Sequence, residues 1–395
     1  MNIRVLEDLP IDSKKVFLRL DLNVPIENGE ITDATRIEAA IPTIQYILER
    51  THKVAIATHL GRPKGKPEPK YSVEPVGKKL AELLGKEVIF VTDYLEESAS
   101  RILETLKPGQ VLLLENLRFH PGEEKNSPDF ASKLIQGFDY FVNDAFGAVH
   151  RAHASVVACA EILSPDQRAA GLLIQKEIAA LSGMLKNPKA PFVVVMGGSK
   201  VSDKISVILN LLKLCNHLLI GGAMAYTFLK FRGVDVGASK TEDDKLDLVA
   251  SIYRNAEARK VNIELPVDHV ASMSFDPSAA PIAVNNVALR QGLMGLDIGP
   301  RTVSRFSEMI RGANTVLWNG PMGVFEWEPF SHGSMGIAHA MAESQGFTVI
   351  GGGDSVAAAN MAGVASKISH ISTGGGASLE FLEGQVLPGL RVLMK

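Results

Sequence analysis

The chain has few cysteines and no long apolar run. Its only two cysteines, Cys159 and Cys215, lie far apart, so they form neither a disulfide framework nor the spacing of a zinc site. The longest apolar stretch, LLIGGAMAYTFL, is well short of a membrane span and is interrupted by glycines. The first residues, MNIRVLEDLP, carry charges where a signal peptide needs apolar side chains. We therefore expect a cytoplasmic protein with no membrane partner.

A strong excess of charge is also absent. The net charge is −3 at pH 7, so no overall positive field favours nucleic acid as a partner. The motifs H-E-x-x-H, G-x-S-x-G and H-R-D are missing, as are the Walker A spacing and the G-x-G-x-x-G turn of nicotinamide dehydrogenases. These absences argue against the enzyme classes that the motifs mark. The length of 395 residues favours two domains rather than one.

Short β-branched runs alternate with helical patterns along the chain, which predicts an α/β fold with largely parallel sheets. Strands are expected in the first half at residues 16–24, 54–60, 88–91, 111–117 and 140–146, and in the second half at 191–196, 217–222, 262–270, 315–319, 348–353 and 370–373. Between the halves, Ile174, Ile178 and Leu181 recur at helical spacing, and Asn187-Pro188 ends the pattern. One amphipathic helix joining two α/β halves implies a hinge.

The two halves differ in the residues at the carboxyl ends of their strands, where open α/β sheets bind ligands. The first half supplies basic side chains: Arg36, His59, Arg62, Arg118, His150, Arg151 and His153. The second half supplies glycine turns: GGSK, GGA, NGPMG, GGGDS and TGGGAS. Arginine forks bind carboxylates and phosphates, and glycine turns that lead into helices let backbone N–H groups approach a polyphosphate. Two different anions, one in each half, suggest a transfer between them.

The first predicted strand carries polar side chains on one face. Arg19, Asp21 and Asn23 alternate with leucines in RLDLNVP. We expect Asp21 and Asn23 to hold the hydroxyl groups of a small polyol acid, with Arg19 orienting them. The alternative is an edge strand that simply shows its polar face to solvent.

Two glycine turns carry charged residues. Lys200 and Lys204 are expected on one face of a first helical turn, where like charges repel and cations oppose the helix dipole. A nucleotide phosphate would relieve both costs, whereas solvated lysines would tolerate them. After GGG, Asp354 and Ser355 open another helix, where they are either plain N-caps or, for Asp354, a Mg²⁺ ligand beside phosphates.

Ten segments, in order from residue 19 to residue 384, together resemble the phosphoglycerate kinase family: RLDLNVP, TRIEAAIPTI, HLGRP, LLLENLRFH, NDAFGAVHRAHAS, GGSKVSDK, MGLDIGP, LWNGPMGVFE, GGGDS and STGGGASLEFLEG. The resemblance implies two Rossmann-like lobes with largely parallel sheets, joined by a hinge helix, with the active site in the cleft between the lobes. It places the phosphoglycerate lobe at 1–170, joined by residues from about 377 to 395, the linker helix at 171–187 and the nucleotide lobe at 188–376. It implies reversible transfer between 1,3-bisphosphoglycerate with MgADP and 3-phosphoglycerate with MgATP, in glycolysis and gluconeogenesis, by a monomer.

The resemblance also assigns the site residues. Those for the acid substrate would be Asp21, Asn23, Arg36, His59, Arg62, Arg118 and Arg151. Those for the nucleotide would be Lys200, Lys204, Gly222, Gly295, Leu296, Asn319, Glu326, Gly352, Gly353, Asp354 and Ser355, with Asp354 at Mg²⁺.

The chemistry fits an acceptor that needs no base, because a carboxylate is already ionised at neutral pH. We expect in-line transfer with charge stabilised by Arg36 and Lys200, the two catalytic candidates, together with Mg²⁺ and glycine-loop amides. Two rivals stay open at this point: a kinase for another carboxylate, such as an amino acid, and a two-lobed binding protein without catalysis.

Overall fold

A computed structural model describes residues 2–96 and 98–395. The chain divides into two compact units: unit 1 comprises Met1–Ala179 and Val386–Lys395, and unit 2 comprises Ala180–Gln385. The division falls inside helix α7, Leu172–Lys186. The sequence-based expectation of a helix over this part of the chain is confirmed. No helix in the described ranges is long and apolar enough to cross a membrane.

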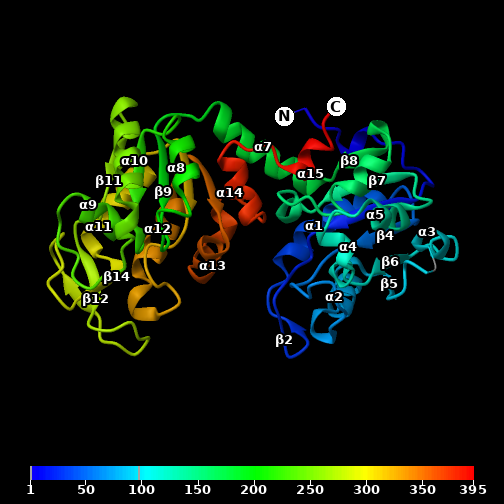
Figure 1. The fold of residues 1–395 in the computed structure, drawn as a ribbon, viewed down its shortest axis with the longest axis horizontal. Helices are drawn as coiled ribbons and strands as arrows, with labels where there is room; N and C mark the ends of the chain where they lie inside the picture. The colour runs from blue at the N-terminus through cyan, green and yellow to red at the C-terminus, as the bar shows by residue number, and fades with distance from the viewer. Residues whose placement is uncertain (1, 97) are drawn as a thin grey trace. The chain divides into compact units, whose positions relative to one another are not determined.

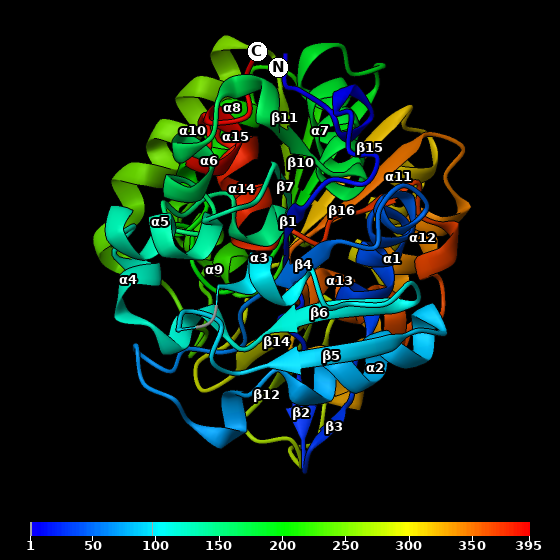
Figure 2. The ribbon, with the colours of Figure 1, turned by 90° about the vertical axis from the view of Figure 1, so that its right-hand side faces the viewer.

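Unit 1 is built on a six-stranded sheet in the order β5-β6-β4-β1-β7-β8, with every neighbouring pair parallel. Its strands are β1 Val16–Leu20, β4 Val54–Ala57, β5 Glu87–Val91, β6 Gln110–Leu114, β7 Tyr140–Asp144 and β8 Arg168–Ala170, and a small ribbon pairs β2 Ile26–Glu27 with β3 Glu30–Ile31. Its helices are α1 Thr35–Leu48, α2 Glu74–Leu84, α3 Ala99–Ile102, α4 Pro121–Glu124, α5 Pro128–Ile135, α6 Ala158–Ile162 and α15 Pro388–Arg391. Helix α2 packs beside β5 (Figure 2). Strand β8 was not predicted, because Arg-Ala-Ala has neither β-branched nor aromatic side chains.

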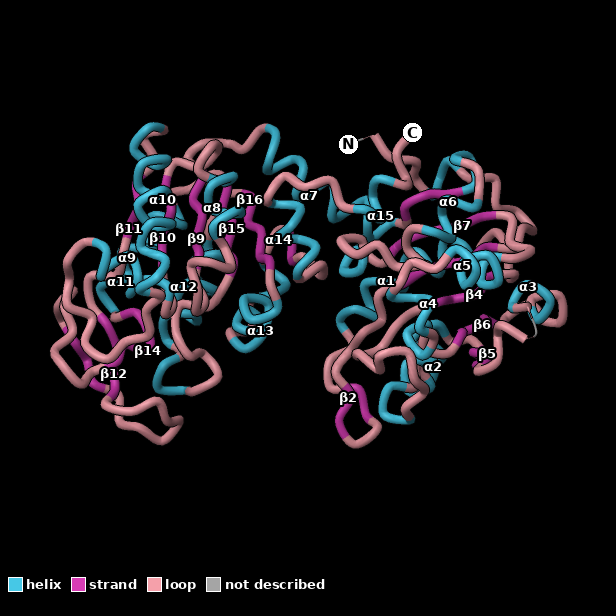
Figure 3. The backbone as a smooth tube through the Cα atoms, in the orientation of Figure 1, coloured by secondary structure: helices cyan, strands magenta, loops and turns pink. Residues whose placement is uncertain are grey.

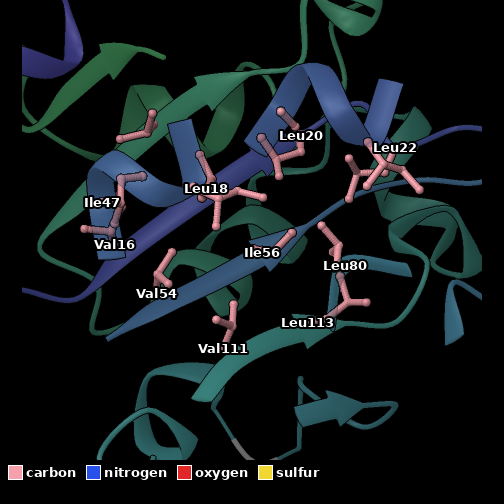
Figure 4. Packing of buried hydrophobic residues seen from close by; sticks show 14 of the residues in the cluster. Val16, Leu18, Leu20, Leu22, Ile47, Val54, Ile56, Leu80, Val111 and Leu113 are labelled. Atoms are coloured by element: carbon pink, nitrogen blue, oxygen red, sulfur yellow. The ribbon is translucent and has the colours of Figure 1, made fainter. Parts of the chain in front are cut away.

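Strand β1 lies in the middle of this sheet, between β4 and β7. All five of its residues are buried, and Leu18 and Ile56 belong to one apolar cluster with Leu113 (Figure 4). The edge-strand alternative for this segment is therefore wrong. Arg19 is buried inside the unit rather than solvated, so its charge has to be satisfied by protein groups.

Unit 2 is built on a second parallel sheet in the order β11-β10-β9-β15-β16-β17 and a three-stranded antiparallel sheet in the order β13-β12-β14 (Figure 3). The strands are β9 Phe192–Met196, β10 His217–Ile220, β11 Asn262–Glu264, β12 His269–Ser272, β13 Ile282–Val284, β14 Met294–Ile298, β15 Thr315–Asn319, β16 Phe347–Gly351 and β17 His370–Ile371. The helices are α8 Ile205–Leu211, α9 Met224–Phe231, α10 Leu246–Ala258, α11 Pro300–Arg311, α12 His332–Glu343, α13 Gly353–Met361 and α14 Gly376–Leu382.

One strand expectation in unit 2 is wrong. Residues 262–270 were expected to form a single strand, but β11 and β12 belong to different sheets. Pro266 lies between them and has no N–H to donate to a ladder, so the chain leaves the parallel sheet there.

The two ends of the chain meet within unit 1. Ile3 pairs with Met394 in an antiparallel bridge, and both termini lie side by side in Figures 1 and 2. The last ten residues thus return to the unit that contains the N-terminus.

Candidate functional site

A cluster of basic side chains lies at the carboxyl ends of β1 and β4 and in the segments after β6 and β7, at one edge of the unit 1 sheet. The guanidinium of Arg36 contacts Asp21 Oδ1 at 3.3 Å and donates to the carbonyl oxygen of Asn23 at 3.0 Å. The side chain of Asn23 accepts from the N–H of Gly61 at 2.9 Å, and Arg118 donates to the Gly61 carbonyl at 2.7 Å. Four of the predicted acid-binding residues are thus joined by hydrogen bonds around one short loop.

The electrostatics of this cluster favour an anion. Burial lowers the pKa of His59 well below its ordinary value, and the charges of Arg19, Arg118 and Arg36 lower it further. Burial, with Arg19 and Arg151, lowers the pKa of Arg118 to about 10. Positive charges that are crowded together in this way repel one another, and a bound anion offsets this repulsion. The cluster therefore suits a carboxylate or a phosphate.

Two predicted arginines lie at the margin of this cluster. Arg62 is exposed and makes no hydrogen bond or ion pair with the part of the chain that the structure describes. Arg151 donates from Nε to Nε2 of His150 at 3.1 Å. The guanidinium of Arg62 therefore has no partner among the described residues. The two terminal amino groups of Arg151 take no part in its bond to His150.

Unit 2 contains a cavity of about 540 Å³ lined largely by glycine and apolar side chains. Five predicted nucleotide residues line it: Gly222, Gly295, Leu296, Glu326 and Asp354. A Cβ atom at Gly295 would lie 1.8 Å from the hydroxyl oxygen of Tyr226, so only glycine leaves this wall in place. A mostly apolar cavity of this kind suits a heterocyclic base.

A second cavity of about 240 Å³ is lined by glycines of three turns and by one cation. It contains six predicted residues: Lys204, Asn319, Gly352, Gly353, Asp354 and Ser355. Asp354 lines both cavities. Gly352 has a φ of 92°, which favours glycine, and it leads directly into α13. Backbone N–H groups at such a helix start can bind phosphate.

Lys204 and Ser355 are fixed by contacts in this second cavity. Lys204 Nζ donates to the side-chain oxygen of Asn319 and, at 3.3 Å, to the carbonyl oxygen of the same residue. Burial lowers the pKa of Lys204 to about 8, although the charge of Asp354 opposes the shift. The hydroxyl of Ser355 accepts from the N–H of Gly320 at 2.6 Å, so it holds the NGP turn in place.

The prediction that Lys200 and Lys204 share one helical turn is wrong. Helix α8 begins at Ile205, and Lys200 lies before the turn that precedes the helix. The carboxylate of Glu242 accepts from the N–H groups of Val201 and Ser202 at 2.6 and 3.1 Å, which holds this segment as a turn. Lys200 is exposed and lines neither cavity.

Several residues of the first cavity were not predicted. Tyr226, Lys240, Phe275 and Met322 line it, and Phe275 is 65% exposed. Tyr226 lies in the interior of α9, and Phe275 lies in a loop after β12, so only the tertiary structure brings them to one cavity. In the sequence, the one indication of this cavity is that Phe275 stands among residues typical of turns.

The described residues contain no group of three or more His, Cys, Asp or Glu side chains placed to hold a metal ion. Asp354 is an exposed carboxylate between the base-sized and the phosphate-sized cavities. Mg²⁺ binds through one or two carboxylates together with substrate phosphates. The residues present therefore fit a cation that arrives with the nucleotide.

A nucleotide-sized pair of cavities in one α/β unit and a cationic cluster in the other define a phosphotransferase. The family model for phosphoglycerate kinase matches residues 6–385. Similar curated proteins are phosphoglycerate kinases of Anaeromyxobacter sp. (strain Fw109-5), 51% identical over 100% of both chains, and of Bdellovibrio bacteriovorus, 49% identical over 99% of this chain and 97% of that one. The chain belongs to the phosphoglycerate kinase family, as its motifs indicated.

Solved structures agree with this result. Phosphoglycerate kinase from Coxiella burnetii is 39% identical, with a TM-score of 0.89 over 99% of this chain and 98% of that chain. The enzyme from Pyrococcus horikoshii OT3 is 36% identical, with a TM-score of 0.83 over the same shares. The predicted fold class of two α/β lobes with largely parallel sheets is confirmed.

Proposed function

We propose that this chain catalyses reversible phosphoryl transfer between 1,3-bisphosphoglycerate with MgADP and 3-phosphoglycerate with MgATP, in glycolysis and gluconeogenesis. The observation that carries the proposal is the pairing of a base-sized cavity and a phosphate-sized cavity that share Asp354. Membership of the phosphoglycerate kinase family supports it. We propose further that the enzyme is a cytoplasmic monomer with no membrane or nucleic-acid partner.

The acid substrate is assigned to unit 1. Asp21 and Asn23 bind the glycerate end, and the basic side chains His59, Arg62, Arg118, Arg151 and Arg36 bind its carboxylate and 3-phosphate. The lowered pKa values of His59 and Arg118 support this role, because crowded cationic groups favour a bound anion. A substrate with two anionic groups suits the cluster better than a neutral hydroxyl compound.

The nucleotide is assigned to unit 2. The base lies against Gly222, Gly295 and Leu296 in the larger cavity, and Glu326 contacts the ribose hydroxyls. The phosphates lie in the smaller cavity against Gly352, Gly353, Lys204 and Asn319, with Ser355 supporting the turn. Asp354 binds the Mg²⁺ that comes with the nucleotide, and this ion neutralises phosphate charge.

When ATP is the phosphoryl donor, a carboxylate oxygen of 3-phosphoglycerate forms a bond to the γ-phosphorus of ATP. The bond from that phosphorus to the β,γ-bridging oxygen breaks, and ADP is released. No proton has to be removed from the acceptor, so no general base is required. Arg36 and Lys200 remain our candidates for stabilising charge on the transferred group. Lys200 is exposed, which leaves its side chain free for this role.

The test is ATP consumption with 3-phosphoglycerate and Mg²⁺, coupled to NADH oxidation through glyceraldehyde-3-phosphate dehydrogenase. Aspartate and unphosphorylated glycerate serve as alternative acceptors, read out by ADP release. We expect Mg²⁺-dependent turnover with 3-phosphoglycerate only. Turnover with aspartate alone would identify a different carboxylate kinase, and nucleotide binding without any turnover would favour the non-catalytic alternative.

The hinge inferred from the sequence also stays a proposal. Transfer requires the two bound substrates to meet, so we expect small-angle scattering to give a smaller radius of gyration with both substrates than with neither. An unchanged radius would contradict this expectation.

A further inference from the structure

Arg19 is a completely buried cation next to the acid-binding cluster. It is the fourth residue of β1, and none of its side chain is exposed. Its Nε donates to the hydroxyl oxygen of Ser155 at 2.7 Å, and its Nη1 contacts the carbonyl oxygen of Leu20. Its Nη2 lies 3.1 Å from Nδ1 of His59. Three different groups therefore fix the plane of the guanidinium.

The anchor behind Arg19 is a buried carboxylate. Glu123 is fully buried and accepts from the hydroxyl of Ser155 at 2.6 Å and from its backbone N–H at 2.9 Å. Its nearest approach to the guanidinium of Arg19 is 4.0 Å. Glu123 thus balances the charge of Arg19, and the same nitrogen, Nη2, that approaches Glu123 also contacts His59.

The contact between Arg19 and His59 determines where the imidazole carries its proton. A guanidinium has only donors, so His59 Nδ1 has to accept and cannot carry a hydrogen. A neutral imidazole then has its single proton on Nε2. That nitrogen lies 3.9 Å from Asp21 Oδ1, within the cluster assigned to the acid substrate.

The surroundings of His59 also disfavour the doubly protonated ring. The groups that oppose protonation of His59 are the cations Arg19, Arg118 and Arg36 and, were it charged, His153, whereas Asp21, whose Oδ1 lies 3.9 Å from Nε2, favours it. His153 is itself kept neutral, since burial and the neighbouring arginines lower its pKa to about 3. His59 thus stays neutral over the range in which an ordinary histidine titrates.

We propose that Arg19 is a positioning residue that holds His59 as the neutral Nε2–H tautomer, so that His59 donates a hydrogen bond to the anionic acid substrate rather than offering a charge. The identity of that substrate rests on the proposed function, but the tautomer does not. The arrangement has a functional consequence: the hydrogen bond from His59 is independent of pH between about 5.5 and 8.5, whereas an ordinary histidine would lose its charge across this range.

The decisive measurement is two-dimensional ¹⁵N–¹H NMR of the imidazole rings in the full chain, with His59 assigned from a His59→Gln spectrum. We expect a protonated Nε2, an unprotonated Nδ1 and no titration between about pH 5.5 and 8.5. A protonated Nδ1, or an imidazolium at about pH 6, would overturn the proposal. This spectrum needs no substrate and no turnover, so its outcome is separate from that of the coupled assay.

The matched variants are Arg19→Met and Arg19→Lys. In Arg19→Met, we expect a roughly tenfold rise in KM for 3-phosphoglycerate above about pH 7, a new dependence of that KM on pH near about 6.5, and little change in KM for ATP. Arg19→Lys keeps a donor and a charge, so it should retain most of the flat pH profile. Because Arg19→Met leaves Glu123 buried and unbalanced, it can fail to fold, and the wild-type spectrum then decides. A folded Arg19→Met with the wild-type tautomer and a flat profile would also overturn the proposal.

Discussion

Asp144 Oδ1 accepts a hydrogen bond of 2.9 Å from the backbone N–H of Ile174 in the first turn of α7. Asp144 is the last residue of β7 and is fully buried, and its other oxygen has no hydrogen-bond partner in the described part of the chain. A Cβ atom at Gly171 would lie 2.4 Å from the carboxyl carbon of Asp144, so glycine is required for this approach. A buried carboxyl group thus closes the N-terminal end of the helix shared by the two units.

Asp144→Asn should change how stability depends on pH. Burial raises the pKa of Asp144 to about 7, well above its value in an unfolded chain. The folded state therefore retains a proton that the unfolded state has lost, and the associated stability is full below about pH 4 and is lost as pH rises through about 7. Asparagine can still accept from Ile174 but does not ionise. We expect the wild-type Tm to fall relative to that of Asp144→Asn between about pH 5 and 8, measured by calorimetry. Parallel profiles would contradict the prediction.

Lys204→Gln should remove a pH dependence of nucleotide binding. The amine of Lys204 has a pKa lowered to about 8 by burial, so in the free protein it loses its charge as pH rises through that value. If phosphates bind only the charged form, affinity for MgATP should fall about tenfold between about pH 7 and 9. Titration calorimetry measures this fall. In Lys204→Gln the affinity should be lower and flat.

The control for this measurement is Lys213→Gln. Lys213 is exposed and lies just after α8, the helix that Lys204 precedes. Among the described residues its amine donates only to Asn210, at 3.1 Å. It should keep the wild-type fall in affinity. An equal fall in Lys204→Gln would mean that another group titrates.

Gly295→Ala should damage the larger cavity. The added Cβ atom would lie 1.8 Å from the hydroxyl oxygen of Tyr226, which is fixed by a 3.3 Å contact with Nδ1 of the buried His269. The tyrosine or β14 must therefore move into the space for the base. We expect KM for ATP to rise roughly tenfold or more, with KM for 3-phosphoglycerate little changed.

Gly183→Ala is the matched substitution. Gly183 lies within α7, and a Cβ atom there would meet nothing within 4 Å. Alanine at a helix position should raise stability by about 0.5–1 kcal/mol and leave both KM values unchanged. A rise in KM for ATP in both variants would mean that the effect of Gly295→Ala is not local.

Much of the site could be predicted because it depends on local patterns. Glycine turns after strands stand out in the sequence, and parallel strands bring their ends to one edge, so Gly352 and Gly375, from two separate turns, line one cavity as expected. The basic residues of unit 1 follow the same rule, and Asn23 and Arg118 meet at Gly61 although they lie far apart in sequence. Neither result required knowledge of tertiary packing.

The part of the site that could not be predicted depends on contacts between residues that are distant in sequence. The turn that follows Lys200 is held by Glu242, about forty residues later, so no local rule could show that the helix starts only at Ile205. The burial of Arg19 is offset by Ser155 and Glu123, which belong to other segments. The polar face of β1 therefore indicated a binding site. It did not indicate which of the charged side chains on that face would be buried and which would be solvated.

Arg36→Ala should reduce turnover more than binding. Arg36 contacts Asp21 at 3.3 Å and the Asn23 carbonyl at 3.0 Å, and a third of its side chain is exposed, which leaves part of its guanidinium to act on developing charge. Removal of one such preorganised donor typically lowers kcat about 10²–10³-fold. We expect a loss of this size, with much smaller changes in both KM values. The control is Arg50→Ala, because Arg50 lies just beyond the other end of α1 and its side chain has the same exposed fraction of 33%. Among the described residues this side chain bonds only to its neighbours Tyr46 and Glu49. Steady-state kinetics of the two variants decide the role: equal losses in kcat and in substrate affinity for Arg36→Ala would make Arg36 a binding residue, and a similar loss in Arg50→Ala would make the effect structural.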